Sequence, residues 1–122
     1  MKIVVVDDDK DVRHLLEDVV EQSGHTAVLA SNGREAWELL DRGEKFDFII
    51  SDNDMPEMDG VELLQRVRGN SRTAGIPFIL VSAGDPVPLK EICAKHSADF
   101  LPKPFSVFTL LAMLNVGVEV EG

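Results

Sequence analysis

Short apolar stretches alternate with longer amphipathic stretches five times along this chain. We expect β-strands at the apolar stretches, namely Ile3–Asp7, Thr26–Ala30, Phe46–Asp52, Ile76–Ser82 and Asp99–Leu101. Three of the five contain apolar runs without polar alternation: Ile3–Val6, Phe48–Ile50 and Phe78–Val81. Such runs are typical of parallel strands that helices cover on both faces.

The segments between and after these strands have the period of amphipathic helices. The clearest apolar stripe repeats at i, i+3, i+4, i+7 and i+8: Val12, Leu15, Leu16, Val19 and Val20. Asp9 or Asp11 is placed to cap this helix. Similar stripes follow the capping candidate Asn32, follow Asp59-Gly60, and run from Val107 to Leu114. Each stripe predicts a helix with one face packed on the sheet.

Two prolines mark a shorter fourth helix. Pro86 and Pro88 fit the first turn of a helix but not its interior, which predicts a helix from about Pro88 to His96. The resulting (βα)5 alternation predicts an α/β fold, a doubly wound parallel sheet with right-handed crossovers and helices on both faces. At 122 residues the chain has the size of one domain. We expect that domain to occupy residues 1–117, with 118–122 as the start of a linker or a cloning tail.

Composition narrows the function classes. The formal net charge of −10 argues against direct nucleic-acid binding, because phosphates would be repelled. No apolar run approaches the length of a membrane span, and the N-terminus lacks the layout of a signal peptide. The single cysteine, Cys93, cannot form an internal disulfide, which fits a reducing cytoplasm.

Polar residues with useful chemistry follow three of the predicted strands. Asp7 and Asp8 close the first strand, Asp52 closes the third, and Lys103 follows the fifth. Ligands bind at the carboxyl ends of the strands in open α/β sheets. Two carboxylates about 4 Å apart repel each other by roughly 4 kcal/mol at an effective dielectric of about 20, so such a cluster favours a bound cation. Magnesium fits best, because it takes hard oxygen ligands and works beside phosphates.

The same residues predict phosphoryl transfer. A carboxylate such as Asp52 can accept a phosphoryl group as a nucleophile. The charge on the equatorial oxygens of that group could be stabilised by the cation, by Lys103 and by the hydroxyl of Ser82 at the end of the fourth strand.

Four motifs then occur in a specific order and spacing. They are Ile3-Val-Val-Val-Asp-Asp-Asp, Phe48-Ile-Ile-Ser-Asp-Asn-Asp-Met-Pro-Glu-Met-Asp-Gly, Ile79-Leu-Val-Ser-Ala and Phe100-Leu-Pro-Lys-Pro-Phe. With these motifs the chain resembles, over essentially its whole length, the receiver domains of two-component response regulators. The resemblance implies a flavodoxin-like fold with strand order 2-1-3-4-5. It also implies a cytoplasmic signalling domain, not an enzyme in the ordinary sense, although one that assists its own phosphorylation and dephosphorylation.

The resemblance assigns a role to each site residue. Asp52 would be phosphorylated by a sensor histidine kinase or a phosphotransfer protein, in a reaction that depends on Mg²⁺, with Mn²⁺ as a possible substitute. Asp8 and Asp52 would bind the ion by carboxylate, Asp7 through water, and Asp54 by its backbone carbonyl. Lys103 would contact the phosphoryl group.

The resemblance also implies a switch. Ser82 would move toward the phosphoryl group, and Phe100 would turn into the vacated space. The Lys103–Pro104 bond would be cis, as is usual in the family. The phosphorylated state would then be relayed to a downstream effector domain or protein through the face formed by the fourth helix, the fifth strand and the last helix.

Two features depart from the family pattern. Asp54 adds an acid at the mouth of the pocket; it is either a solvated turn residue or a charge that alters attack of water on the phosphoryl group. No charged residue occurs from Pro104 to Val118, whereas one large branch of the family builds symmetric dimers with charged residues there. Phe108 and Met113 lie off the apolar stripe of this last helix. A phosphorylation-dependent dimer is compatible with the resemblance, but a charged dimer face is not expected.

Two other interpretations remain open. Asp52-Asn53-Asp54 also resembles the Asp-x-Asp signature of haloacid-dehalogenase-type phosphatases, in which the first Asp is the nucleophile and the second the general acid. In those enzymes the nucleophile motif comes first in the chain and a pair of acids comes last, whereas here the pair Asp7-Asp8 comes first. The third interpretation is an interaction module that works without phosphorylation. The intact set of Asp7, Asp8, Asp52, Ser82 and Lys103 argues against it.

Overall fold

Five parallel strands form one sheet in the order β2-β1-β3-β4-β5. The computed structural model describes residues 1–118, and the side chains up to Asn115. The strands are β1 (Lys2–Val6), β2 (Thr26–Ala30), β3 (Phe48–Asp52), β4 (Phe78–Ser82) and β5 (Asp99–Pro102). The order and the parallel pairing confirm the doubly wound, flavodoxin-like prediction.

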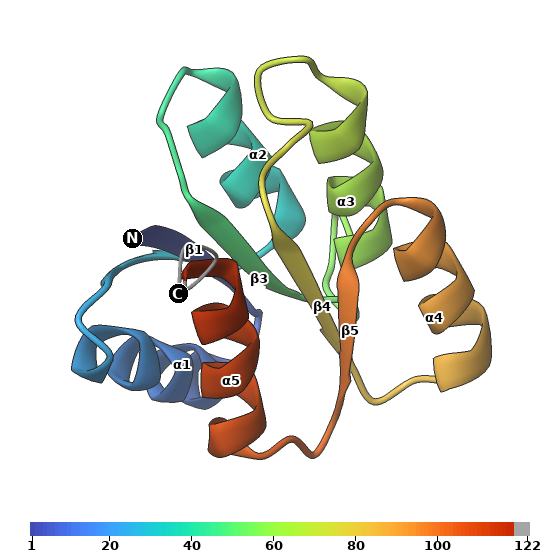
Figure 1. Ribbon diagram of the computed structural model, residues 1–122. Coiled ribbons are helices and arrows are strands. Elements are labelled where there is room, and N and C mark those ends of the chain that lie inside the picture. Colours follow the sequence, from blue (N-terminus) through green and yellow to red (C-terminus); the bar gives the residue numbers. More distant parts are fainter. Residues whose placement is uncertain (119–122) are drawn as a thin grey trace.

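Helices cover both faces of this sheet (Figure 1). They are α1 (Lys10–Gln22), α2 (Gly33–Asp41), α3 (Gly60–Gly69), α4 (Pro86–Lys95) and α5 (Val107–Val118). α1 and α5 lie together on one face, and α2, α3 and α4 lie on the other (Figure 1). Because all five strands are parallel, they all end at the same edge of the sheet.

The sheet separates two apolar clusters. The larger one joins the sheet to α2, α3 and α4 and includes Val4, Ile49, Leu80, Leu40, Leu63, Leu64 and Cys93. The other joins it to α1 and α5 and includes Ile3, Ile50, Val81, Leu16, Val20, Leu110 and Leu114. β3 and β4 are buried along their whole length, which explains their unbroken apolar runs.

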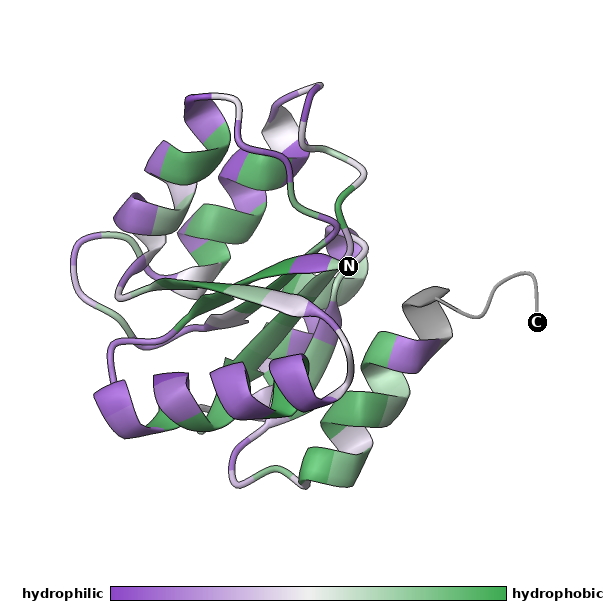
Figure 2. Cartoon of the chain, turned by 90° about the vertical axis from the view of Figure 1, so that its left-hand side faces the viewer, coloured by the Kyte–Doolittle hydropathy of each residue, from purple (hydrophilic) through white to green (hydrophobic). Residues whose placement is uncertain are grey.

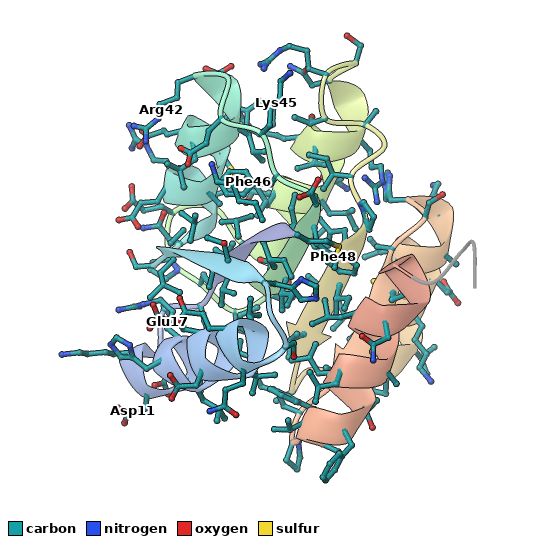
Figure 3. All side chains as sticks on the ribbon, turned by 60° about the vertical axis from the view of Figure 1, so that its left-hand side comes forward. Asp11, Glu17, Arg42, Lys45, Phe46 and Phe48 are labelled. Carbon is teal, nitrogen blue, oxygen red and sulfur yellow. The ribbon has the colours of Figure 1, made fainter. Side chains whose placement is uncertain are left out.

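The outer surfaces of α1 and α5 differ in polarity. Asp11 and Glu17 project from the outer side of α1, whereas Phe46 and Phe48 lie inside the molecule (Figure 3). α1 is therefore amphipathic. Apolar residues make up most of α5 (Figure 2), and Phe108 on this helix is 82% exposed.

Some element boundaries differ from the sequence prediction, for local reasons. β4 begins at Phe78 and not at Ile76, because the intervening Pro77 has no N–H for the strand ladder. α4 begins two residues earlier than expected: the side chain of Asp85 accepts the Val87 N–H, and Pro86 is the first helical residue.

Caps and bonds at the other termini agree with the prediction. Asp9, and not Asp11, caps α1 by accepting the N–H groups of Asp11 and Val12. Asn32 caps α2 as predicted. The Lys103–Pro104 bond is cis, which confirms that prediction.

Of the expected tail, residues 119–122 lie outside the described residues, so the domain boundary stays a prediction. Within residues 1–118, no helix combines the length and apolar content needed to cross a bilayer.

The packing at Gly60 fixes the turn after β3. A Cβ at this position would lie 2.5 Å from the backbone oxygen of Asp52 and 2.6 Å from Cδ1 of Leu80. Only a glycine therefore lets α3 begin this close to the end of β3. At Gly69, at the other end of the same helix, a Cβ would meet nothing within 4 Å.

We predict that Gly60→Ala lowers the free energy of unfolding by about 3 kcal/mol, because the new methyl must push against backbone atoms. Gly69→Ala is the matched control and should be neutral or stabilising by up to about 1 kcal/mol. Urea unfolding followed by circular dichroism measures both. Equal stability of the two variants would contradict the close approach at Gly60.

Candidate functional site

The register of the sheet brings the predicted site residues to one edge. Val6 pairs with Ser51, so the next residues, Asp7 and Asp52, lie side by side at the ends of β1 and β3. Ser82 pairs with Pro102 at the ends of β4 and β5, and the Lys103 N–H donates to the Ser82 carbonyl at 2.9 Å. Residues that are up to 96 positions apart in the chain thus meet at one rim.

Lys103 lies opposite two carboxylates. Its ammonium is 3.2 Å from Oδ1 of Asp52 and 3.7 Å from Oδ2 of Asp7. Asp7 and Asp52 are 1% and 4% exposed, while Asp8 beside them is exposed. One cation therefore faces two buried acids and a third at the surface, which leaves the rim with an excess of negative charge.

This burial shifts the acid–base properties of the site. Desolvation raises the pKa of Asp7 above its ordinary value, although the N–H of Asp9, which donates to Oδ1 at 2.9 Å, acts in the opposite direction. Desolvation likewise raises the pKa of Asp52, against the lowering effect of Lys103. Burial alone would lower the pKa of Lys103, but the two carboxylates outweigh it and raise that pKa.

The acid cluster has the donor atoms of a divalent cation site. One oxygen each from Asp7, Asp8 and Asp52 lie within 4.8 Å of one another. Oδ1 of Asp52 is buried and receives no hydrogen bond from the described residues, since the Lys103 ammonium is near it but not aligned for one. Hard carboxylate oxygens with a spare acceptor are what Mg²⁺ requires, so the residues present fit this ion.

Ser82 lies at the same rim but contacts a different acid. Its side chain is fully buried, and its hydroxyl donates to Oδ2 of Asp54 at 3.3 Å. The same hydroxyl oxygen accepts the N–H of Gly84 at 2.9 Å. Asp54 is exposed, which agrees with its expected place at the mouth of the pocket.

Phe100 is not part of this cluster. It lies on β5 opposite Leu80, is half-buried, and packs against the apolar cluster on the α2–α4 face. Its position on the strand beside β4 brings it near the element that carries Ser82.

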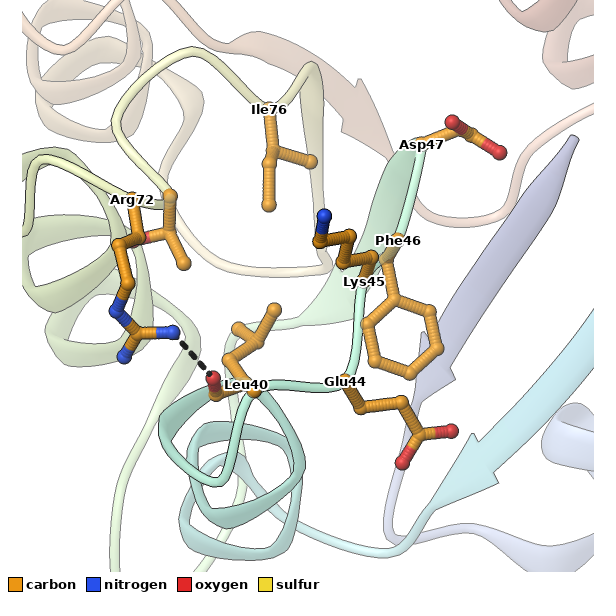
Figure 4. A pocket seen from close by; sticks show the side chains of 9 residues that line it. Leu40, Glu44, Lys45, Phe46, Asp47, Arg72 and Ile76 are labelled. Carbon is orange, nitrogen blue, oxygen red and sulfur yellow. Dashed lines mark hydrogen bonds between the residues drawn. The ribbon is translucent and has the colours of Figure 1, made fainter.

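Two hollows on the surface of the described residues bear on where the site lies. The larger, of about 580 Å³, is at the opposite edge of the sheet and is lined by Leu40, Glu44, Lys45, Phe46, Asp47, Arg72 and their neighbours (Figure 4). It contains none of the acids at the rim, so it is not the site of the chemistry. The smaller, of about 410 Å³, adjoins the site: Lys103 lines it together with Val12, Leu15, Ala83, Pro104, Phe105 and Val107.

Comparison with known proteins gives a consistent answer. The model of the family described as "Response regulator receiver domain" matches residues 3–115. A chemotaxis protein CheY homolog of Campylobacter jejuni is 34% identical over 108 residues, which cover 87% of this chain and 83% of the relative. Chemotaxis protein CheY1 of Helicobacter pylori is 34% identical over 118 residues, which cover 95% of both chains.

Solved structures agree. The receiver domain of the Francisella response regulator 1452 superposes with a TM-score of 0.88 at 31% identity, covering 99% of this chain and 98% of that one. The chain belongs to the response regulator receiver domain family. Receiver domains are phosphorylation-activated signalling domains and not classical enzymes, and they bind Mg²⁺ in an acidic pocket. The match to the family model spans both Asp52 and Asp54 and gives no support to the phosphatase alternative.

The receiver domain also contains supporting residues that sequence reasoning missed. Arg13 donates from Nη1 to the carbonyl of Asp7 at 2.9 Å and so ties α1 to the end of β1. Ser51 donates to the carbonyl of Asp52 at 2.8 Å. Gly84 supplies the N–H that Ser82 accepts. Only Gly84 had a sequence signal, a glycine two residues after the end of a strand; the other two contacts depend on side-chain directions.

The raised pKa values of Asp7 and Asp52 have a consequence for stability. The native state binds these protons more tightly than the unfolded chain does, so the ionised carboxylates destabilise the fold above their raised pKa values. The lost free energy of unfolding is recovered as the pH falls through the raised pKa of the folded state toward the ordinary pKa of a carboxyl group.

We therefore predict that Asp52→Asn raises the free energy of unfolding by on the order of 1 kcal/mol at neutral pH with EDTA present. The gain should shrink in acid, where wild-type Asp52 is protonated, and when Mg²⁺ replaces EDTA. Asp18→Asn, at an exposed position of α1, is the control and should change stability by less than about 0.5 kcal/mol. Urea unfolding at several pH values measures this, and a destabilised Asp52→Asn protein would contradict it.

Proposed function

We propose that this receiver domain accepts a phosphoryl group on Asp52 from a sensor histidine kinase or a phosphotransfer protein, in a reaction that requires Mg²⁺. The observation that carries the proposal is the state of Oδ1 of Asp52. It is a buried carboxylate oxygen that forms an ion pair with the Lys103 ammonium at 3.2 Å and accepts no further hydrogen bond from the described residues. A nucleophile needs such a free lone pair, and the nearby cation is placed to offset the charge that arrives.

The transfer step uses few protein groups. A lone pair of the Asp52 carboxylate forms a bond to phosphorus while the P–N bond of the donor's phosphohistidine breaks, and that electron pair leaves on the imidazole nitrogen. Lys103 holds one oxygen of the phosphoryl group, and the Ser82 hydroxyl donates to another. Both residues lie at the rim, Ser82 at the end of β4 and Lys103 directly after β5.

The ion site supports the same proposal. The carboxylates of Asp8 and Asp52 and the backbone carbonyl of Asp54 would hold Mg²⁺, with Asp7 acting through water; Mn²⁺ could substitute. When bound, the ion supplies positive charge that stabilises the phosphoryl oxygens. The present excess of two buried carboxylates over one ammonium is the imbalance that such a cation relieves.

We infer that the phosphorylated state is relayed through the face formed by α4, β5 and α5 to a downstream effector domain or protein. Ser82 would move toward the phosphoryl group, and Phe100 on β5 would turn inward. The uncharged surface of α5, with Phe108 exposed, favours an apolar contact on this face, in a complex or a dimer that depends on phosphorylation. If beryllofluoride with Mg²⁺ left the NMR signals of Ser82 and Phe100 unmoved, this relay would be wrong.

The direct test of the proposed function is chemical labelling. Incubation with acetyl phosphate and Mg²⁺ should add a phosphoryl group to the peptide that contains Asp52, detected by mass spectrometry. Asp52→Asn should abolish the modification, and EDTA should prevent it. Absence of label at Asp52 with both acetyl phosphate and a competent kinase would contradict the proposal.

Asp54→Asn serves as the matched control, because it changes the acid two residues away in the same loop. It should still be labelled at Asp52. The same variant tests the alternative chemistry: turnover of a phosphate monoester by the wild-type protein, lost in Asp54→Asn, would instead indicate a haloacid-dehalogenase-type phosphatase.

A further inference from the structure

The hydroxyl of Ser82 is already engaged before any phosphoryl group arrives. It has one proton, which it donates to Oδ2 of Asp54 at 3.3 Å, while its oxygen accepts the Gly84 N–H at 2.9 Å. Ser82 is fully buried, so water does not compete for this proton from bulk solvent. Two protein groups therefore set the direction of the hydroxyl: the side chain of Asp54, two residues after β3, and the N–H of Gly84, two residues after β4.

The proposed function gives this proton a second acceptor. A phosphoryl oxygen on Asp52 would need the Ser82 hydroxyl as a donor, but one hydroxyl proton cannot serve Asp54 and the phosphoryl group together. Asp54 follows Asp52 by two residues and carries the same sign of charge as the incoming group. The exchange of acceptors is therefore a competition between two anions at the mouth of one pocket.

We propose that Asp54 is a positioning residue that holds the Ser82 hydroxyl in its unphosphorylated direction and so opposes the switch. The inference rests on the proposed function, because it concerns what phosphorylation of Asp52 must overcome. Its effect is exerted through Ser82 and not through the cation site. The part of Asp54 expected to contact the ion is its backbone carbonyl, which side-chain substitution leaves in place.

The geometry limits how strong this restraint is. The bond is long, at 3.3 Å, and Asp54 is exposed, so water competes for its carboxylate. Such a bond biases the position of Ser82 but does not lock it. A bias of this size suits a switch, because the stronger, charge-assisted bond to a phosphoryl oxygen can displace it.

Beryllofluoride with Mg²⁺, a mimic of the phosphoryl group, tests the proposal with the whole chain. Its dissociation constant can be measured by NMR titration for wild type, Asp54→Ala, Ser82→Ala and the double variant. Asp54→Ala should tighten binding roughly three- to tenfold, because the Ser82 proton becomes available. In the Ser82→Ala background the same substitution should change binding by less than about twofold, since no hydroxyl remains to be released.

The double variant separates the hydrogen bond from simple charge repulsion. If Asp54→Ala tightened binding equally with and without the Ser82 hydroxyl, repulsion would explain the gain and the inference would be overturned. Glu57→Gln is the control for loss of one charge from the same loop. Glu57 pairs with Arg34, whereas the Ser82 hydroxyl bonds to Asp54 and Gly84. The binding constant of Glu57→Gln should match that of wild type.

A second readout needs no ligand. In wild-type protein without Mg²⁺, the Gly84 amide bonds to a hydroxyl whose direction Asp54 sets, so Asp54→Ala should shift the Gly84 amide resonance and Glu57→Gln should not. An unmoved Gly84 signal would overturn this inference but not the proposed function. Failure of wild type to bind beryllofluoride at all would instead refute the proposed function.

Discussion

One ammonium group opposite two buried carboxylates is the interaction on which the rest of the site depends. Burial disfavours the ionised forms of Asp7 and Asp52, and Lys103 compensates only in part, so both carboxylates keep raised pKa values. A protein designed only for stability would not keep this imbalance. It becomes useful when a divalent cation and a phosphoryl group bind together, because each relieves the charge that the other would leave unbalanced.

The fold serves this charge arrangement through the geometry of its strand ends. Parallel strands finish at one edge, so consecutive segments of the chain each deliver one functional side chain to the same rim. Close packing then keeps these ends in place: α3 begins directly against the Asp52 carbonyl, where only Gly60 fits. The Ser82 hydroxyl, held between Asp54 and Gly84, has present bonds that differ from those that its proposed role requires. Stability and switching thus depend on neighbouring atoms of the same rim.

Sequence patterns predicted the fold, and they predicted that Asp7, Asp8, Asp52, Ser82 and Lys103 would meet at one rim, for identifiable physical reasons. Unbroken apolar runs required strands covered on both faces, and a polar residue directly after such a run had to lie at the strand's carboxyl end. Strand starts were less predictable: Ile76 was included in β4, although Pro77 interrupts the ladder. Contacts between side chains and distant backbone, such as Arg13 with the Asp7 carbonyl, leave no periodic signal. The bond from Ser82 to Asp54 was missed for the same reason, because it depends on which way a hydroxyl points.

Our main proposal is that the acidic rim binds a divalent cation and that Asp52 accepts a phosphoryl group there. A crystal structure of the protein with Mg²⁺ and beryllofluoride tests it most directly. We expect the ion on the carboxylates of Asp8 and Asp52, and beryllofluoride on an Asp52 oxygen in contact with Lys103 and Ser82. An ion bound elsewhere, or beryllofluoride absent from Asp52 in crystals grown with both, would refute this proposal.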